Sequence, residues 1–247
     1  MIQLLRAELI KLRTTRTFVA LAAVAVATSV VIVCLITLLS EPSEEDVLVD
    51  VFTTDTSSLF ITILAIVGIT GEWRHRTITS SLLAAPDRTR FLAAKVLAFA
   101  AAGALLSVLI SVGIGIVGYV ILSVRDLPTP ELGEILGQFA RNVEVAALLG
   151  GFGVGLGSLV RNQAVAIVFV LLLGFLIEPT LLALAPDVGI WGPFNGLPTA
   201  VQDIPAENVG FEDADFLSPG VALLGMLAWI AALFAGGAAL LTRRDLD

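Results

Sequence analysis

The sequence predicts an all-α polytopic membrane protein with six transmembrane helices, an N-terminal interfacial helix and a short helix between spans 2 and 3. Of its 247 residues, 57% are hydrophobic, and the mean hydropathy is +0.97. Only 15% are charged, whereas soluble domains contain about 25%. This composition excludes a soluble α/β enzyme and a disordered chain. The single cysteine, Cys34, excludes a disulfide scaffold.

Uncharged runs long enough to cross the bilayer predict the spans, because about 20 helical residues cover the hydrocarbon core. We expect one domain, residues 1–247, with spans at about 17–40, 56–71, 96–124, 140–160, 162–182 and 218–241. The second run is the shortest and can cross the bilayer only if flanking residues extend the helix. Arg161 interrupts the fourth and fifth runs, so we expect a tight turn there.

Residues 1–16 predict an amphipathic helix along the membrane surface. Its apolar residues share one face and its arginines crowd the edges of that face: Ile2, Leu5, Leu9 and Leu12, with Arg6, Arg13 and Arg16. This pattern is typical of a helix lying in the interface. A basic topology signal without a mechanical role explains the segment equally well.

The distribution of charge predicts the orientation of the chain. Twelve of the fourteen basic residues fall on one side of the predicted membrane, and only Arg125 and Arg141 fall on the other. The positive-inside rule therefore places both termini in the cytoplasm, with the chain in a cell (inner or plasma) membrane. The outer loops around 40–55 and 187–215 carry twelve acids and no base, which explains the net charge of −8. That acidity argues against a nucleic-acid partner.

The loop over residues 71–95 contains a further helix signal. Ile78, Leu82 and Ala85 repeat at helical spacing, Pro86 ends the pattern, and Asp87 can cap the helix that follows. A short apolar-faced helix held below the bilayer is typical of a docking element. Alternatively, the arginines of this loop only anchor helix ends at the lipid head groups.

The same loop carries a family resemblance. Glu72, Thr77, Leu82-Leu83, Pro86, Arg90 and Lys95 resemble the cytoplasmic loop of ABC-2 type transporter permeases, although Arg76 stands where that family usually has glycine. The opening segment LRAELIKLRTTRT resembles the N-terminus of these permeases. The number of spans and the cytoplasmic termini are also similar to that family.

The resemblance implies a permease subunit that forms the translocation path for export and is not itself an enzyme. ATP and Mg would bind to a separate ABC ATP-binding subunit, and this chain would hold no cofactor. In agreement, its sequence contains no GxxxxGK[ST] phosphate loop. A second permease copy or a paralogue would complete the assembly in the lipid bilayer. The coupling residues implied are Glu72, Thr77, Ile78, Leu82, Leu83, Pro86 and Arg90.

Two weaker features lie inside the spans. Glu178 is the one acid expected at membrane depth, where it either belongs to the translocation path or ends a helix near the outer interface. Alternating glycines in the fourth span predict close helix packing, within one chain or between two: Gly151, Gly153, Gly155 and Gly157. We also expect Arg141 to pair with Glu144, three residues away.

Other function classes fit the sequence less well. The alternative is an ATP-independent channel or secondary transporter, or a non-enzymatic membrane scaffold. A secondary transporter should show several charges within its spans and broken-helix repeats, and this sequence offers only Glu178. An intramembrane protease needs histidine partnered with serine or with metal ligands. The one histidine, His75, stands between two arginines and predicts no metal site.

Overall fold

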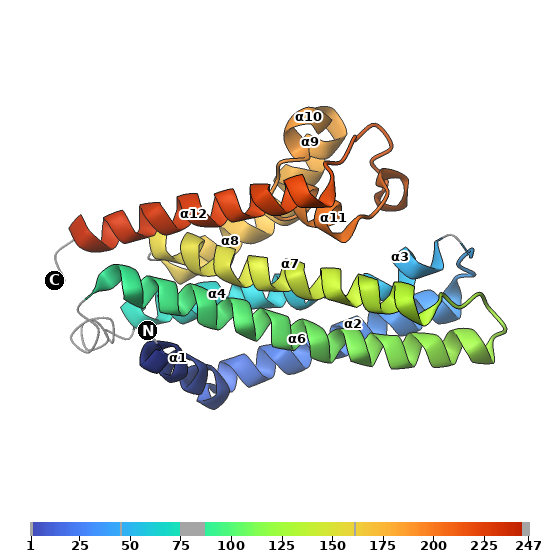
Figure 1. Ribbon diagram of the computed structural model, residues 1–247, viewed down its shortest axis with the longest axis horizontal. Coiled ribbons are helices and arrows are strands. Elements are labelled where there is room, and N and C mark those ends of the chain that lie inside the picture. The colour runs from blue at the N-terminus through green and yellow to red at the C-terminus, as the bar shows by residue number, and fades with distance from the viewer. Residues whose placement is uncertain (1, 45, 75–86, 161, 244–247) are drawn as a thin grey trace.

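The computed structural model describes residues 2–44, 46–74, 87–160 and 162–243. The predicted helix around Ile78–Ala85 lies outside these residues. Within them the chain is helical without strands, and its long helices run along one axis (Figure 1). Six segments are long and apolar enough to cross a membrane: Arg16–Leu39, Val47–Arg74, Arg88–Val124, Leu132–Leu159, Gln163–Leu184 and Pro219–Thr242. The prediction of an all-helical fold is therefore confirmed, and the number of helices suited to cross a membrane agrees with the six predicted spans.

Helices α1 (Ile2–Thr14), α2 (Arg16–Leu39), α4 (Ser57–Arg74), α6 (Arg88–Val124), α7 (Leu132–Leu159) and α12 (Pro219–Arg243) build most of the bundle. Both termini lie at the same end (Figure 1), which we call the termini end; α1 packs there against α6 and α2. We call the opposite end, with α3 (Val47–Phe52), the loop end. At the termini end the guanidinium of Arg88 donates to the carbonyl of Leu241, which joins α6 to α12.

The second span is built from two helices, which explains why its apolar run is short. Helices α3 and α4 are separated by residues 53–56. Asp55 ends this break, because its Oδ1 accepts a hydrogen bond from the backbone N–H of Ser57 at 2.7 Å. A carboxylate in this position satisfies a donor that the first turn of a helix leaves unpaired.

Helix α7 occupies the centre of the bundle. In its most apolar window 78% of residues are buried, against 17% in α2 and in α12. A Cβ at Gly153 would lie 2.7 Å from the Thr62 carbonyl oxygen of α4, and one at Gly155 would lie 2.8 Å from Cβ of Leu233 in α12. Alternating glycines therefore let α7 approach two neighbours of the same chain closely.

The fifth span changes its winding midway. It comprises α8 (Gln163–Leu172), a π-helical turn (Leu173–Ile177) and α9 (Glu178–Leu184). Pro179 has no N–H to continue an α-helical ladder, and the wider turn ends two residues before it. Asn162 begins the span as a cap, since its side-chain oxygen accepts from the N–H of Val165 at 3.2 Å.

The remaining short helices lie between the fifth and sixth spans: α10 (Pro186–Gly189), α11 (Gly196–Gln202) and a 3₁₀ turn (Ala206–Val209). Helix α11 packs against α12 and α7. Arg141 of α7 reaches this region, where its guanidinium forms an ion pair with Asp203 at 2.9 Å and donates to the carbonyl of Gln202. The expected pairing of Arg141 with Glu144 is therefore wrong, because the long side chain finds a partner across the loop.

Candidate functional site

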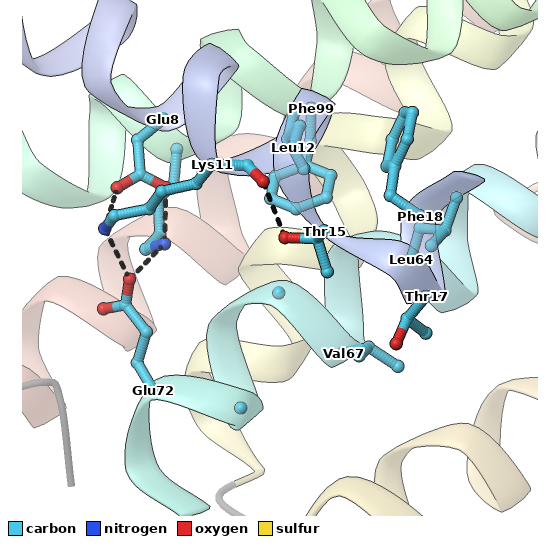
Figure 2. Close-up of a pocket in the computed structure, with 13 residues that line it drawn as sticks. Glu8, Lys11, Leu12, Thr15, Thr17, Phe18, Leu64, Val67, Glu72 and Phe99 are labelled. Carbon is cyan, nitrogen blue, oxygen red and sulfur yellow. Dashed lines mark hydrogen bonds and ion pairs between the residues drawn. The ribbon is translucent and has the colours of Figure 1, made fainter. Parts of the chain in front are cut away.

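Four charged side chains form a closed ring at the termini end. Lys11 Nζ lies 2.7 Å from Glu8 Oε1 and 3.1 Å from Glu72 Oε1. Lys95 Nζ lies 2.7 Å from Glu8 Oε2 and 2.8 Å from Glu72 Oε1. We call this group the charge ring; it contains both lysines of the protein. Figure 2 shows Glu8 and Lys11 of α1 facing Glu72 of α4.

Most of the ring is buried. The exposed fraction is 1% for Lys95, 5% for Glu8 and 8% for Glu72, whereas half of the Lys11 side chain is exposed. Buried charges persist only when they are paired and hydrogen-bonded, which the alternating arrangement achieves for both lysines. The Lys95 ammonium also lies 5.2 Å from the centre of the Phe91 ring, a favourable cation–π distance.

Three helices position the ring. Glu8 lies on the otherwise apolar face of α1, three residues after Leu5 and four before Leu12. Lys95 lies on the buried face of α6, four residues from both Phe91 and Phe99. Glu72 belongs to the last turn of α4. The ring thus joins the N-terminal helix to two spans.

The ring shifts the pKa values of the two α1 side chains in opposite directions. Burial alone would raise the pKa of Glu8, but the charges of Lys95 and Lys11 and their hydrogen bonds outweigh it and hold that pKa below 4.5. Burial alone would lower the pKa of Lys11, but hydrogen bonds and charge from Glu8 and Glu72 hold it above 10.5. Both groups are therefore charged near neutral pH.

A cavity of about 600 Å³ adjoins the ring between α1, α2, α4 and α6. Figure 2 shows the charged side chains at one end of this cavity and Phe18, Leu64 and Val67 at the other. Thr15 and Thr17, at the junction of α1 and α2, also line it and are exposed. The cavity thus combines a charged end with an apolar wall and reaches the surface of the protein.

Of the predicted coupling residues, Glu72 and Arg90 fall within the described residues. Glu72 belongs to the charge ring. Arg90 is exposed and forms an ion pair with Asp87 at 3.0 Å. Asp87 caps α6, as its sequence position predicts, by accepting hydrogen bonds from the N–H groups of Thr89 and Arg90. The other predicted residues lie outside the described ranges: Thr77, Ile78, Leu82, Leu83 and Pro86.

Glu178 is buried, with 1% of its surface exposed, at the start of α9. Its Oε2 accepts hydrogen bonds from the backbone N–H groups of Phe194 at 2.9 Å and of Asn195 at 2.6 Å. The Asn195 side chain also donates to the Gly174 carbonyl of the π-helical turn. Glu178 therefore fixes the turn before α11 against the fifth span. Its place on a translocation path stays a prediction.

A second polar group lies towards the loop end. The carboxylate of Asp55 contacts the hydroxyls of Ser107 and Ser111 on α6, the latter at 3.2 Å. Asn142 of α7 donates to the carbonyl of Phe52 at 2.8 Å. Asp55 and Asn195 line the same cavity of about 200 Å³. Among the described residues no group of three potential ligands could hold a metal ion.

Comparison with protein-family models found no match for this chain, and comparison with the sequences of curated proteins found none either. The predicted site residues include Glu72 but not Glu8, Lys11 or Lys95, the other three members of the charge ring. Two features of the sequence indicate these residues. An acid lies on the apolar face of α1, and a lysine lies four residues from a phenylalanine on either side.

Proposed function

We propose that this chain is the permease subunit of an ABC transporter of the ABC-2 type, which exports a substrate using ATP hydrolysed by a separate subunit. The charge ring is the observation that carries the proposal. It ties α1 and α6 to the last turn of α4, and α4 ends at Arg74, next to the proposed coupling segment. The family resemblance of that segment and the six spans support the same assignment.

The ring gives a physical route for a push on the coupling segment to reach the membrane. A displacement of Glu72 changes its distance to both lysines, at 3.1 and 2.8 Å, so α1 and α6 must follow or the buried ion pairs must break. Breaking a buried pair is costly, which favours concerted movement of the three helices. Such movement is what alternation between inward-facing and outward-facing states requires.

The proposed roles of the residues follow from this route. Leu82 and Leu83 contact a groove of the ATP-binding subunit, Glu72 transmits the movement, and Arg90 supports the start of α6. Glu178 keeps the outer part of the fifth span in register with the turn before α11. ATP and Mg bind the partner, and a second permease copy or a paralogue completes the path.

We place the charge ring on the cytoplasmic side of the cell membrane, together with both termini. The basic residues support this orientation, because Arg6, Arg13, Arg16, Arg74 and Arg88 all lie at the termini end. An ATP-binding subunit would then meet the chain where the nucleotide is available.

One binding experiment tests both the partner and the side of the membrane. The chain is prepared in sealed inside-out and right-side-out vesicles and mixed with a candidate ABC ATP-binding subunit. We expect binding and stimulated ATP hydrolysis with inside-out vesicles only. The double variant Leu82→Asp/Leu83→Asp should lower the bound fraction by about tenfold, since it places charge in an apolar contact.

The matched control also exchanges two apolar residues for aspartate but at the loop end. Val124 and Leu132 are exposed there, at 78% and 72%. Val124→Asp/Leu132→Asp should leave binding to inside-out vesicles unchanged. Full binding by the Leu82/Leu83 variant would refute the docking role, and binding to right-side-out vesicles alone would refute the orientation.

A further inference from the structure

The cavity beside the charge ring is large enough for part of an amphipathic ligand. Its volume of about 600 Å³ falls within the range of small-molecule sites. Leu12, Phe18, Leu64, Val67 and Phe99 supply an apolar lining, and the charge ring closes one end. A ligand that fits this surface carries an apolar chain and a charged group.

Two glycines of α4 shape this cavity. A Cβ on Gly68 would overlap the ring of Phe99, so glycine allows that ring to form the wall. A Cβ on Gly71 would meet no atom within 4 Å, although Gly71 lines the cavity. The helix therefore leaves open space next to Gly71, so a side chain that begins there can extend into the cavity.

The cavity is lined by residues at the junction of α1 and α2, where the apolar run of the first span begins. Thr15 and Thr17 flank Arg16, the first residue of α2, after which the apolar run of that span begins. The charge nearest the surface is positive, because Lys11 is half exposed and both Arg13 and Arg16 are exposed. Basic groups at this level attract anionic head groups.

We propose that this cavity is a lipid site that holds one acyl chain of an anionic phospholipid. The chain lies along Phe18, Leu64 and Val67, and the head group contacts Lys11 and the arginines of the α1–α2 junction. The ligand comes from the bilayer through the opening beside Thr17. Because the site uses the membrane-facing junction of α1 and α2, it does not depend on an ATP-binding partner.

A photolabelling experiment tests the site on the full chain reconstituted in phosphatidylcholine vesicles. The probe is phosphatidylglycerol with a photoreactive group in one acyl chain, and labelled residues are mapped by mass spectrometry. We expect labelling at Phe18, Leu64 or Val67. Gly71→Leu should lower that labelling by about fivefold or more, because leucine occupies the space of the chain.

Gly113→Leu is the matched control. Gly113 also lies within a helix, and a Cβ there also meets no atom within 4 Å. The two exchanges therefore gain similar helix propensity, and only one fills the cavity. Val67→Phe is a second cavity-filling variant, so the result does not depend on the folding of Gly71→Leu alone.

Three results would overturn the proposal. Unchanged labelling of the cavity residues in both filling variants would show that the chain binds elsewhere. Equal labelling by phosphatidylcholine and phosphatidylglycerol probes would refute the anionic head group. Stronger labelling by a photoreactive free fatty acid than by phosphatidylglycerol would show that the occupant is a soluble amphipath instead of a membrane lipid. The proposal is supported if phosphatidylglycerol labels the cavity more strongly than phosphatidylcholine does, and if only the cavity-filling variants lose this labelling.

Discussion

At the termini end the carboxylates of Glu8 and Glu72 are held by two lysines, whereas towards the loop end the carboxylate of Asp55 is held by serine hydroxyls and a backbone N–H. Both groups lie between helices, and in both a buried carboxylate oxygen accepts hydrogen bonds. They differ in what happens when one partner is removed. Removing one partner of an ion pair leaves an uncompensated charge, whereas removing a hydroxyl leaves only one hydrogen bond unmade.

The two groups connect their helices in different ways. The charge ring joins three helices through four ion pairs that share their charged groups, which under the proposed function suits a place where movement is transmitted. The Asp55 group joins the break in the second span to α6 through contacts that can be lost one at a time. Glu178 resembles the Asp55 group, since backbone N–H groups and not cations hold its carboxylate.

The largest effect is expected for Lys95→Met. This exchange keeps the volume of the side chain but leaves Glu8 and Glu72 buried together with one half-exposed lysine. We expect a loss of about 3–5 kcal/mol in the free energy of unfolding, the usual cost of removing one partner of a buried pair. The loss is measured as a fall in the thermal unfolding midpoint in detergent relative to the wild type.

A second exchange identifies the origin of that loss. In the double variant Lys95→Met/Glu8→Gln the repulsion between carboxylates is removed, so part of the stability should return. A double variant that is less stable than Lys95→Met by the full cost of Glu8→Gln alone would show additivity. The two residues would then contribute independently, and the ring would not act as a unit.

The sequence predicted the spans well because each depends on a long local signal. The run from Thr17 onward, for example, is apolar over more than 20 residues, and no distant contact is needed to make it a span. The second span was the weakest prediction for the same reason. Its helix α3 lies among acidic residues, and only its packing against α6 and α7 shows its place in the bundle.

The charge ring could be predicted only in part. Glu8 and Lys11 stand three residues apart on one helix, a local pair that the sequence displays. Their contacts with Glu72 and Lys95 join residues 61 and 87 positions apart, and those depend on how α1 folds back against α4 and α6. Likewise, the glycines of α7 predicted close packing, but only the fold shows that their neighbours are α4, α6 and α12.

An intermediate effect is expected for Asp55→Asn at the other group. The amide has the same shape as the carboxylate and still accepts the hydrogen bond from Ser57, while its NH₂ group can donate to the serine hydroxyls. We expect a loss of about 1 kcal/mol in the free energy of unfolding. A loss as large as that of Lys95→Met would mean that both groups depend on charge, and the contrast between the two ends would fail.

The smallest effect is expected for Lys11→Gln, because half of this side chain is exposed and solvent screens its two ion pairs. We expect a loss of less than about 1 kcal/mol, and its pH dependence identifies the charge. The pKa of Lys11 is raised above 10.5, so its contribution is fully present below pH 10.5 and disappears as the pH rises through the higher pKa of the folded state. The pKa of Glu8 is lowered below 4.5, so its contribution is present above pH 4.5 and disappears as the pH falls through the lower folded-state pKa.

Thermal midpoints of the wild type, Lys11→Gln and Glu8→Gln across this pH range provide the test. The wild type should approach Lys11→Gln only in alkali and Glu8→Gln only in acid. A difference between the wild type and Lys11→Gln that stays constant through strong alkali would show that the lysine acts by packing, and the charged character of the termini end would then rest on Lys95 alone.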